Sequence, residues 1–208
     1  MKIRNLVRWF LWPIKVLAMR AAVATSDKRQ ICGFEVANLR SSKADVFEEE
    51  LRAAFRVIES IDLVLFRGIR RRLRRIVIAD GEVGYFSPDV IGAVIGAAYF
   101  ERCTAEEIAL VIIHEATHAR LWSRGIRTTA ARRARIEKIC IDAEIAFAKK
   151  LPDAQTVIAA IWEKSANPWW TNEIHGERLA SVVSSRGEQN WVTRIVKKLP
   201  RWTGAGEG

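Results

Sequence analysis

The sequence predicts an α+β protein that is mostly helical, with a small antiparallel sheet packed on one long helix. Three observations lead to this fold class: a helical period over 42–66, short apolar runs punctuated by glycine between 76 and 100, and a capped apolar stretch over 105–123. Of the 208 residues, 50% are apolar and 28% are charged, which excludes a largely disordered chain. Three widely spaced cysteines exclude a disulfide scaffold.

The segment 42–66 carries the clearest helical period. Its apolar residues recur at steps of three and four: Phe47, Leu51, Ala54, Phe55, Ile58, Ile61 and Leu65. Ser42 is a suitable N-cap, and the opposite face is charged. This pattern predicts a long helix that packs on the core.

Strands are predicted after the arginine-rich run 67–75. Residues 76–78 are β-branched, Asp80-Gly81 is typical of a turn, and 84–86 and 93–100 are apolar. We expect these runs to form an antiparallel sheet, with Ala93–Phe100 as a strand that another backbone can approach closely.

The helix expected over 105–123 has clear boundaries. Thr104 with Glu107 three residues later forms a capping box, and Gly125 is a suitable C-terminal stop. Further helices are predicted over 129–151, 155–165 and 176–184.

The formal net charge of +10 is distributed unevenly. Residues 1–29 carry seven Lys or Arg and one Asp, while 76–119 carry one Arg and seven acids. We therefore divide the chain into a basic, apolar N-terminal segment (1–29) and a single domain (30–208). Residues 1–29 are too interrupted to span a bilayer, which favours contact with an anionic membrane surface or packing on the domain. Lys15 argues against a secretory signal, so a cytoplasmic protein with peripheral membrane contact is expected.

Residues 114–118 are His-Glu-Ala-Thr-His, a motif with specific chemistry. On a helix His114 and His118 share one face and can bind one metal ion together. Glu115 lies beside the first ligand and can reach a water molecule without binding the metal. The chain has only three histidines, and uncharged residues surround the motif.

A zinc site needs a third protein ligand, and Glu137 is the best candidate. It follows His118 by 19 residues and falls on the next predicted helix, beside an apolar stripe. Glu144 is the alternative, two turns further on, and Asp142 lies on another face. Glu144 and Asp142 are also candidates to orient the histidines.

His114, Glu115, His118 and Glu137 together make the chain resemble the zincin metallopeptidases, and within them the gluzincins, which have a glutamate third ligand. The resemblance covers about 76–150. It implies one Zn²⁺ ion, a peptide or protein substrate, and Glu115 as the general base of peptide-bond hydrolysis. It also implies that an edge strand before the motif helix binds the substrate backbone, a place that Ala93–Phe100 holds in the sequence.

In the enzymes that the chain resembles, a Tyr or His stabilises the oxyanion. His175 is the candidate here, and Tyr99, Tyr85 and Arg178 are the alternatives. Two other functions stay open: a non-catalytic binding protein with a zincin-like fold, and a basic protein associated with membrane or nucleic acid. Glu115 argues against the first because a structural metal site needs no base. The arginine run 67–75 lacks interleaved aromatic residues, so nucleic acid is an unlikely partner.

Overall fold

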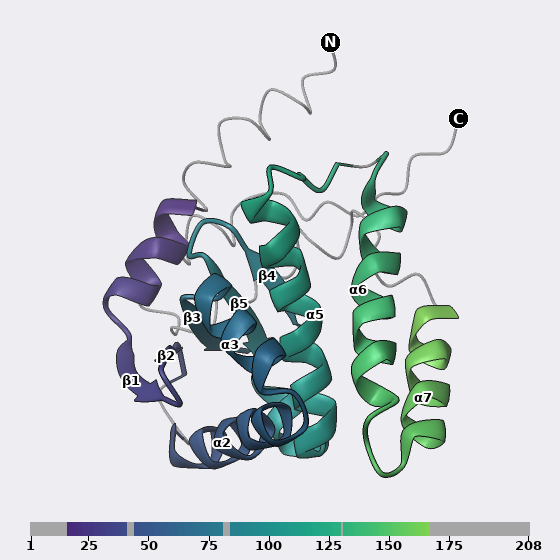
Figure 1. The fold of residues 1–208 in the computed structure, drawn as a ribbon. Coiled ribbons are helices and arrows are strands. Elements are labelled where there is room, and N and C mark those ends of the chain that lie inside the picture. The colour runs from purple at the N-terminus through teal and green to yellow at the C-terminus, as the bar shows by residue number, and fades with distance from the viewer. Residues whose placement is uncertain (1–15, 41–43, 81–83, 130, 167–208) are drawn as a thin grey trace, which may run out of the picture.

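A five-stranded sheet with the order β1-β2-β3-β5-β4 lies at the centre of the fold (Figure 1). The computed structural model describes residues 16–40, 44–80, 84–129 and 131–166. A helix that includes residues 16–24 precedes the labelled elements. These follow in chain order: β1 (Asp27–Ile31), β2 (Phe34–Asn38), α2 (Ala44–Ile61), α3 (Leu63–Arg72), β3 (Arg75–Ala79), β4 (Tyr85–Ser87), β5 (Gly92–Gly96), α4 (Ala97–Arg102), α5 (Ala105–Ser123), α6 (Arg133–Ala148) and α7 (Ala154–Ala166).

The sheet is mixed, so the prediction of an antiparallel sheet is wrong. β1 and β4 pair antiparallel with β2 and β5, but β2, β3 and β5 run parallel. Ala93 of β5 lies between Ile76 of β3 and Phe86 of β4, which makes β4 an edge strand. After β3 the chain crosses to the edge of the sheet as β4 and then returns to the middle as β5, which puts β5 parallel to β3.

The first hairpin was not predicted. Ile31 pairs with Phe34, and Cys32 and Gly33 between them have φ values of 48° and 83°. Positive φ at both central residues is the geometry of a type I′ turn, whose twist matches that of the flanking strands. The Cys-Gly pair between β-compatible runs is a sequence signal that could have located it.

The sheet packs on both faces, because alternate residues of a strand point to opposite sides. Ile76 and Ile78 of β3 join the main core with α2 and α5. Val77 of β3 faces the other way, into a smaller cluster with Met19 and Val23 of the helix at 16–24. The membrane-surface prediction for 1–29 rests largely on residues 1–15, which lie outside the described residues. Within the described residues, no helix has the length and apolar character needed to cross a membrane.

Two predicted elements have different bounds in the structure. The helix expected over 42–66 is two helices, since α2 ends at Ile61 and the side chain of Asp62 accepts a hydrogen bond from the Leu65 amide to cap α3. The strand expected over Ala93–Phe100 ends at Gly96 and continues as α4. The fold is nonetheless α+β and mostly helical, as predicted.

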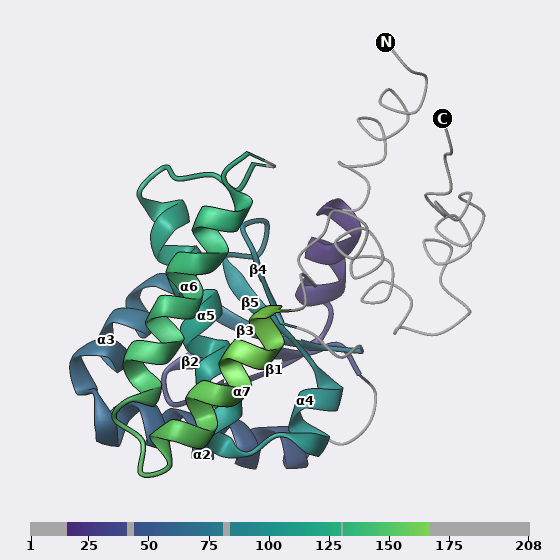
Figure 2. The ribbon, with the colours of Figure 1, turned by 90° about the vertical axis from the view of Figure 1, so that its right-hand side faces the viewer.

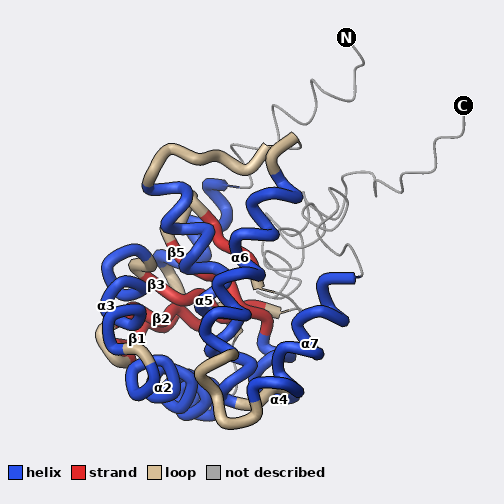
Figure 3. Tube along the Cα trace, turned by 45° about the vertical axis from the view of Figure 1, so that its right-hand side comes forward, coloured by secondary structure: helices blue, strands red, loops and turns tan. Residues whose placement is uncertain are grey.

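Helices α5, α6 and α7 position the functional site. α6 lies between α5 and α7, and α5 and α6 run in opposite directions (Figures 1 and 2). Figure 3 shows the strands behind these helices. The expected helices over 105–123 and 155–165 agree closely with α5 and α7, and α6 occupies the central part of the predicted 129–151 helix. The predicted N-cap Ser42 and the predicted helix over 176–184 lie outside the described residues.

Candidate metal centre

Helix α5 begins where the sequence predicts. The Thr104 hydroxyl accepts a hydrogen bond from the Glu107 amide at 3.3 Å, and the Glu107 carboxylate accepts one from the Thr104 amide at 2.9 Å. Both bonds of the capping box are present, which satisfies amide groups that the first turn leaves unpaired. Gly125, at φ 78°, follows the helix at a conformation that favours glycine. The start of α5 is thus set locally, and helical spacing then places His114 and His118 on one face of the helix.

Helix α6 presents three polar side chains toward the motif. Glu137, Cys140 and Glu144 are spaced by three and four residues, so they line one face of this helix. Glu137 and Cys140 are buried. The structure brings this face against the histidines of α5, as the sequence argument expected for Glu137.

The side chains of His114, His118 and Glu137 converge on one point. His114 Nε2 lies 3.2 Å from His118 Nε2 and 3.2 Å from Glu137 Oε2. His118 Nε2 lies 3.5 Å from the same carboxylate oxygen. Three atoms that can each donate a lone pair therefore form a nearly equilateral triangle in a largely buried place.

This triangle has the size of a zinc site. Nitrogen and oxygen ligands bind zinc at about 2.0–2.1 Å, and in a tetrahedron of that radius neighbouring ligand atoms are roughly 3.3 Å apart. The observed separations of 3.2, 3.2 and 3.5 Å bracket that value. The residues present therefore fit a tetrahedral ion with three protein ligands and one further position.

Glu144 approaches the other side of the His114 ring. Its carboxylate contacts His114 Nδ1, the nitrogen opposite to the one that faces Glu137. With a proton on Nδ1, Nε2 keeps its lone pair for a metal, the usual arrangement around metal-binding histidines. Asp142, the other proposed orienting acid, instead pairs with Lys138 at 2.9 Å on the exposed side of α6.

The histidines and glutamates of the site shift one another's pKa values. Burial opposes the protonated form of His114, but hydrogen bonds to Glu137 and Glu144 outweigh it and raise the pKa of His114 well above its usual value. Burial alone would raise the pKa of Glu137, but hydrogen bonds from His114 and His118 lower it strongly. The carboxylate of Glu137 is thus held ionised, the form in which it can bind a cation.

Cys140 is a second neighbour of the two histidines. Its sulfur lies within 4.8 Å of ligand nitrogens of His114 and His118. Burial, with the nearby carboxylates of Glu137 and Glu115, raises the pKa of the Cys140 thiol, which disfavours the thiolate that metals bind. We favour Glu137 as the third ligand because its oxygen lies within 3.5 Å of both nitrogens and its carboxylate is held ionised, whereas the pKa of the Cys140 thiol is raised.

Glu115 is buried without a complete set of partners. Only 3% of its surface is exposed, and its Oε2 atom has no hydrogen-bond partner among the described residues. Burial raises the pKa of Glu115, and the neighbouring histidines oppose that rise. A buried carboxylate oxygen without a partner costs free energy, so its retention beside His114 suggests that it serves a bound molecule.

The glycine before β4 allows this arrangement. A Cβ atom on Gly84 would lie 2.8 Å from the Val111 side chain and 3.3 Å from Glu115 Oε1. Only glycine therefore lets the chain pass this close to the face of α5 that carries Val111 and Glu115 without displacing either side chain.

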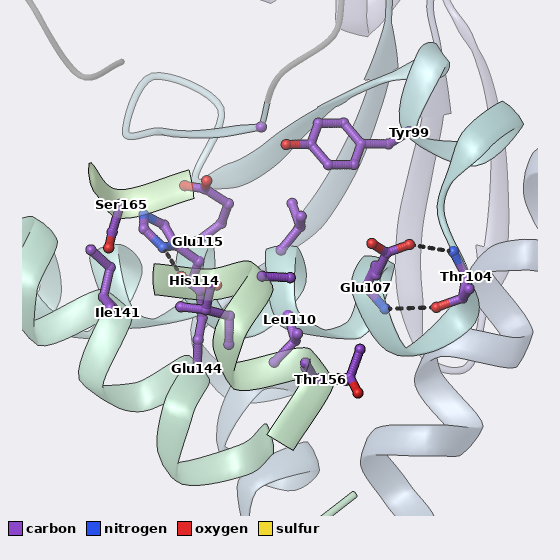
Figure 4. A pocket seen from close by; sticks show the side chains of 15 residues that line it. Tyr99, Thr104, Glu107, Leu110, His114, Glu115, Ile141, Glu144, Thr156 and Ser165 are labelled. Carbon is purple, nitrogen blue, oxygen red and sulfur yellow. Dashed lines mark hydrogen bonds and ion pairs between the residues drawn. The ribbon is translucent and has the colours of Figure 1, made fainter. Parts of the chain in front are cut away.

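A cavity of about 260 Å³ opens beside His114 and Glu115 (Figure 4). Its walls include apolar residues of α5, α6 and α7: Leu110, Val111, Ile141, Val157, Ala160 and Ile161. Tyr99 lies across the cavity, with its hydroxyl directed toward the Glu115 side. The site thus joins a polar centre to an apolar pocket, as substrate sites commonly do.

The structure brings four of the predicted site residues together: His114, Glu115, His118 and Glu137. Tyr85 belongs to the cluster on the other face of the sheet, away from this pocket.

His175 and Arg178 lie outside the described residues. The sequence analysis did not predict that residues of α7 and Gly84 line the pocket beside His114 and Glu115, because only the tertiary fold brings these segments beside the motif. Comparison of the chain with protein-family models, with curated proteins and with solved structures finds no match.

Proposed function

We propose that this protein is a zinc-dependent metallopeptidase. The observation that carries the proposal is the triangle of His114, His118 and Glu137 donor atoms with the edge lengths of a tetrahedral zinc site. The unpartnered oxygen of Glu115 beside this triangle supports a catalytic site over a structural one, because a structural ion needs no neighbouring base.

In this proposal His114, His118 and Glu137 hold one zinc ion. Zinc bound there lowers the pKa of water and polarises a carbonyl group. Glu115 accepts the proton of the attacking water and passes it to the departing amine. Its raised pKa suits it to both tasks, because a carboxyl group of ordinary acidity holds a proton less readily near neutral pH.

Two further features support a peptide substrate. β4 is an edge strand that starts at the pocket, next to Gly84, so an extended peptide could add to the sheet there. This replaces the sequence-based assignment of that role to Ala93–Phe100. The apolar walls of the pocket would take a substrate side chain. Tyr99, whose hydroxyl is directed toward the Glu115 side of the pocket, is our candidate to donate a hydrogen bond to the developing oxyanion. His175 remains the sequence-based alternative for this last role.

The test combines metal content with peptide cleavage. The purified protein should contain one zinc ion per chain by elemental analysis and should cleave members of a mixed peptide library. Glu115→Gln should keep the zinc and lose at least about 100-fold in cleavage, because it removes the base but not a ligand. Glu106→Gln, a change on the same helix outside the pocket, is the control. Absence of zinc, or equal cleavage by the wild type and Glu115→Gln, would overturn the proposal.

A further inference from the structure

A second cavity, of about 470 Å³, lies among α3, α5 and α6. Each helix contributes residues at helical spacing, so the cavity is bounded by three aligned faces. The apolar part of this lining includes Leu65 and Ile69 of α3, Ile113 and Ala116 of α5, and Ala143 and Phe147 of α6. It shares no lining residue with the cavity beside Glu115 and is large enough for a small organic ligand.

The charges around this second cavity are unbalanced. Five charged residues line it: Asp62, Arg72, Arg120, Asp142 and Lys150. Both acids already have lysine partners, since Lys150 binds Asp62 at 2.6 Å and Lys138 binds Asp142 at 2.9 Å. Among the described residues neither arginine has an acidic partner. One side-chain nitrogen of Arg72 donates to the Gly68 carbonyl oxygen.

Arg120 is the more specific of the two cations. Its Nε atom is buried and has no hydrogen-bond acceptor among the described residues. A guanidinium nitrogen removed from water without an acceptor is costly. No acidic side chain among the described residues offsets the charge of this guanidinium group, which lines the cavity, and an anion bound there would do so.

We propose that this cavity binds an aliphatic monocarboxylate, with the carboxylate on Arg120 and the hydrocarbon chain along Leu65, Ile139 and Ala143, lining residues that are partly exposed. The apolar walls favour a ligand with a hydrocarbon body over an inorganic anion. Two paired acids line the same cavity, so a single negative charge fits better than the multiple charge of a phosphate. This inference does not rest on the proposed peptidase function.

The experiment uses isothermal titration calorimetry of the full chain with decanoate, and with decan-1-ol as the uncharged analogue. We expect saturable one-to-one binding of decanoate and at least tenfold weaker binding of the alcohol. Arg120→Met, which keeps an apolar stem, should bind decanoate at least tenfold more weakly. Arg124→Met, an exposed arginine one turn further along that does not line the cavity, should bind like the wild type.

Two further measurements locate the ligand. Ala143→Phe should abolish binding by filling the cavity, and its thermal unfolding and circular dichroism should first establish that it is folded. Decanoate titrations with and without a chelator should agree. No saturable binding by the wild type, wild-type affinity in Arg120→Met, or binding that disappears with the chelator would overturn the proposal. The last result would place the carboxylate at the metal centre instead.

Discussion

The carboxylate of Glu144 contacts Nδ1 of His114, and the opposite nitrogen of the same ring faces Glu137. One imidazole thus joins two carboxylates from two turns of α6. The two glutamates that the sequence left as rivals for one role therefore have different positions. In the proposed metal site, this relationship makes Glu137 the ligand and Glu144 the residue that orients His114.

Replacing Glu144 should weaken metal binding without abolishing it. Glu144→Gln removes the charge that orients His114 and strengthens its lone pair, so zinc affinity should fall by roughly 10–100-fold. Competition with a chromophoric chelator measures the affinity. Asp142→Asn is the matched control, since Asp142 pairs with Lys138 away from the histidines. Equal affinities of the two variants would argue against an orienting role.

The third ligand can be assigned by comparing two neighbours on α6. Glu137→Ala should lose the metal, because it leaves two protein ligands, whereas Cys140→Ala should retain one ion per chain. Elemental analysis of both proteins gives the answer. The reverse pattern would assign Cys140 as the ligand, in line with its distance of at most 4.8 Å from the histidines.

The pocket wall on α7 should control which substrates are accepted. Ala160 lines the cavity, so Ala160→Phe should raise KM for peptides with large apolar side chains while leaving cleavage of small-residue peptides nearly unchanged. The preceding residue offers a control, because Ala159 is exposed and does not line the cavity. If Ala159→Phe and Ala160→Phe give the same specificity profile, the cavity is not a substrate pocket.

The stability contribution of Asp62 should depend on pH. Hydrogen bonds from Lys150 and the Leu65 amide lower the pKa of Asp62. A lowered folded-state pKa means that the stabilisation is complete above the unfolded pKa of about 4 and is lost as the pH falls through the lower folded value. Asp62→Ala should therefore cost about 1 kcal/mol at pH 7, as for other N-caps, and less near pH 2.

Urea unfolding of both proteins at the two pH values measures this difference. Asp153→Ala changes an exposed aspartate that precedes α7 and has no lysine partner among the described residues. It shows how much of the pH dependence would arise from an aspartate near a helix start without the Lys150 pair. A cost that stays constant between pH 7 and pH 2 would contradict the assigned role of the Asp62 charge.

Local patterns were enough to predict much of the helical part of the fold. The capping box at Thr104 and Glu107 depends only on residues three apart, and it sets where α5 begins. The same local geometry places His114 and His118 on one face. The proposal of Glu137 required only that the next helix fold back on the first, which the short connection after Gly125 favours.

The sheet could not be obtained in this way. Whether β5 lies beside β3 or at the edge depends on contacts between strands far apart in the chain, and the residues of β5 are buried in either arrangement. The break at Asp62 was also missed, because the apolar period continues through Leu65 and conceals a capping side chain.

The sequence by itself determined which groups the proposed site can use: two histidines one turn apart, a glutamate beside the first, and a carboxylate on the following helix. The tertiary structure alone decided how these groups divide their tasks. It placed Glu137 and Glu144 on opposite nitrogens of His114, and it brought α7 alongside to make a pocket. The physical reason is that helical spacing fixes which residues share a face, whereas the packing of whole helices fixes which faces meet.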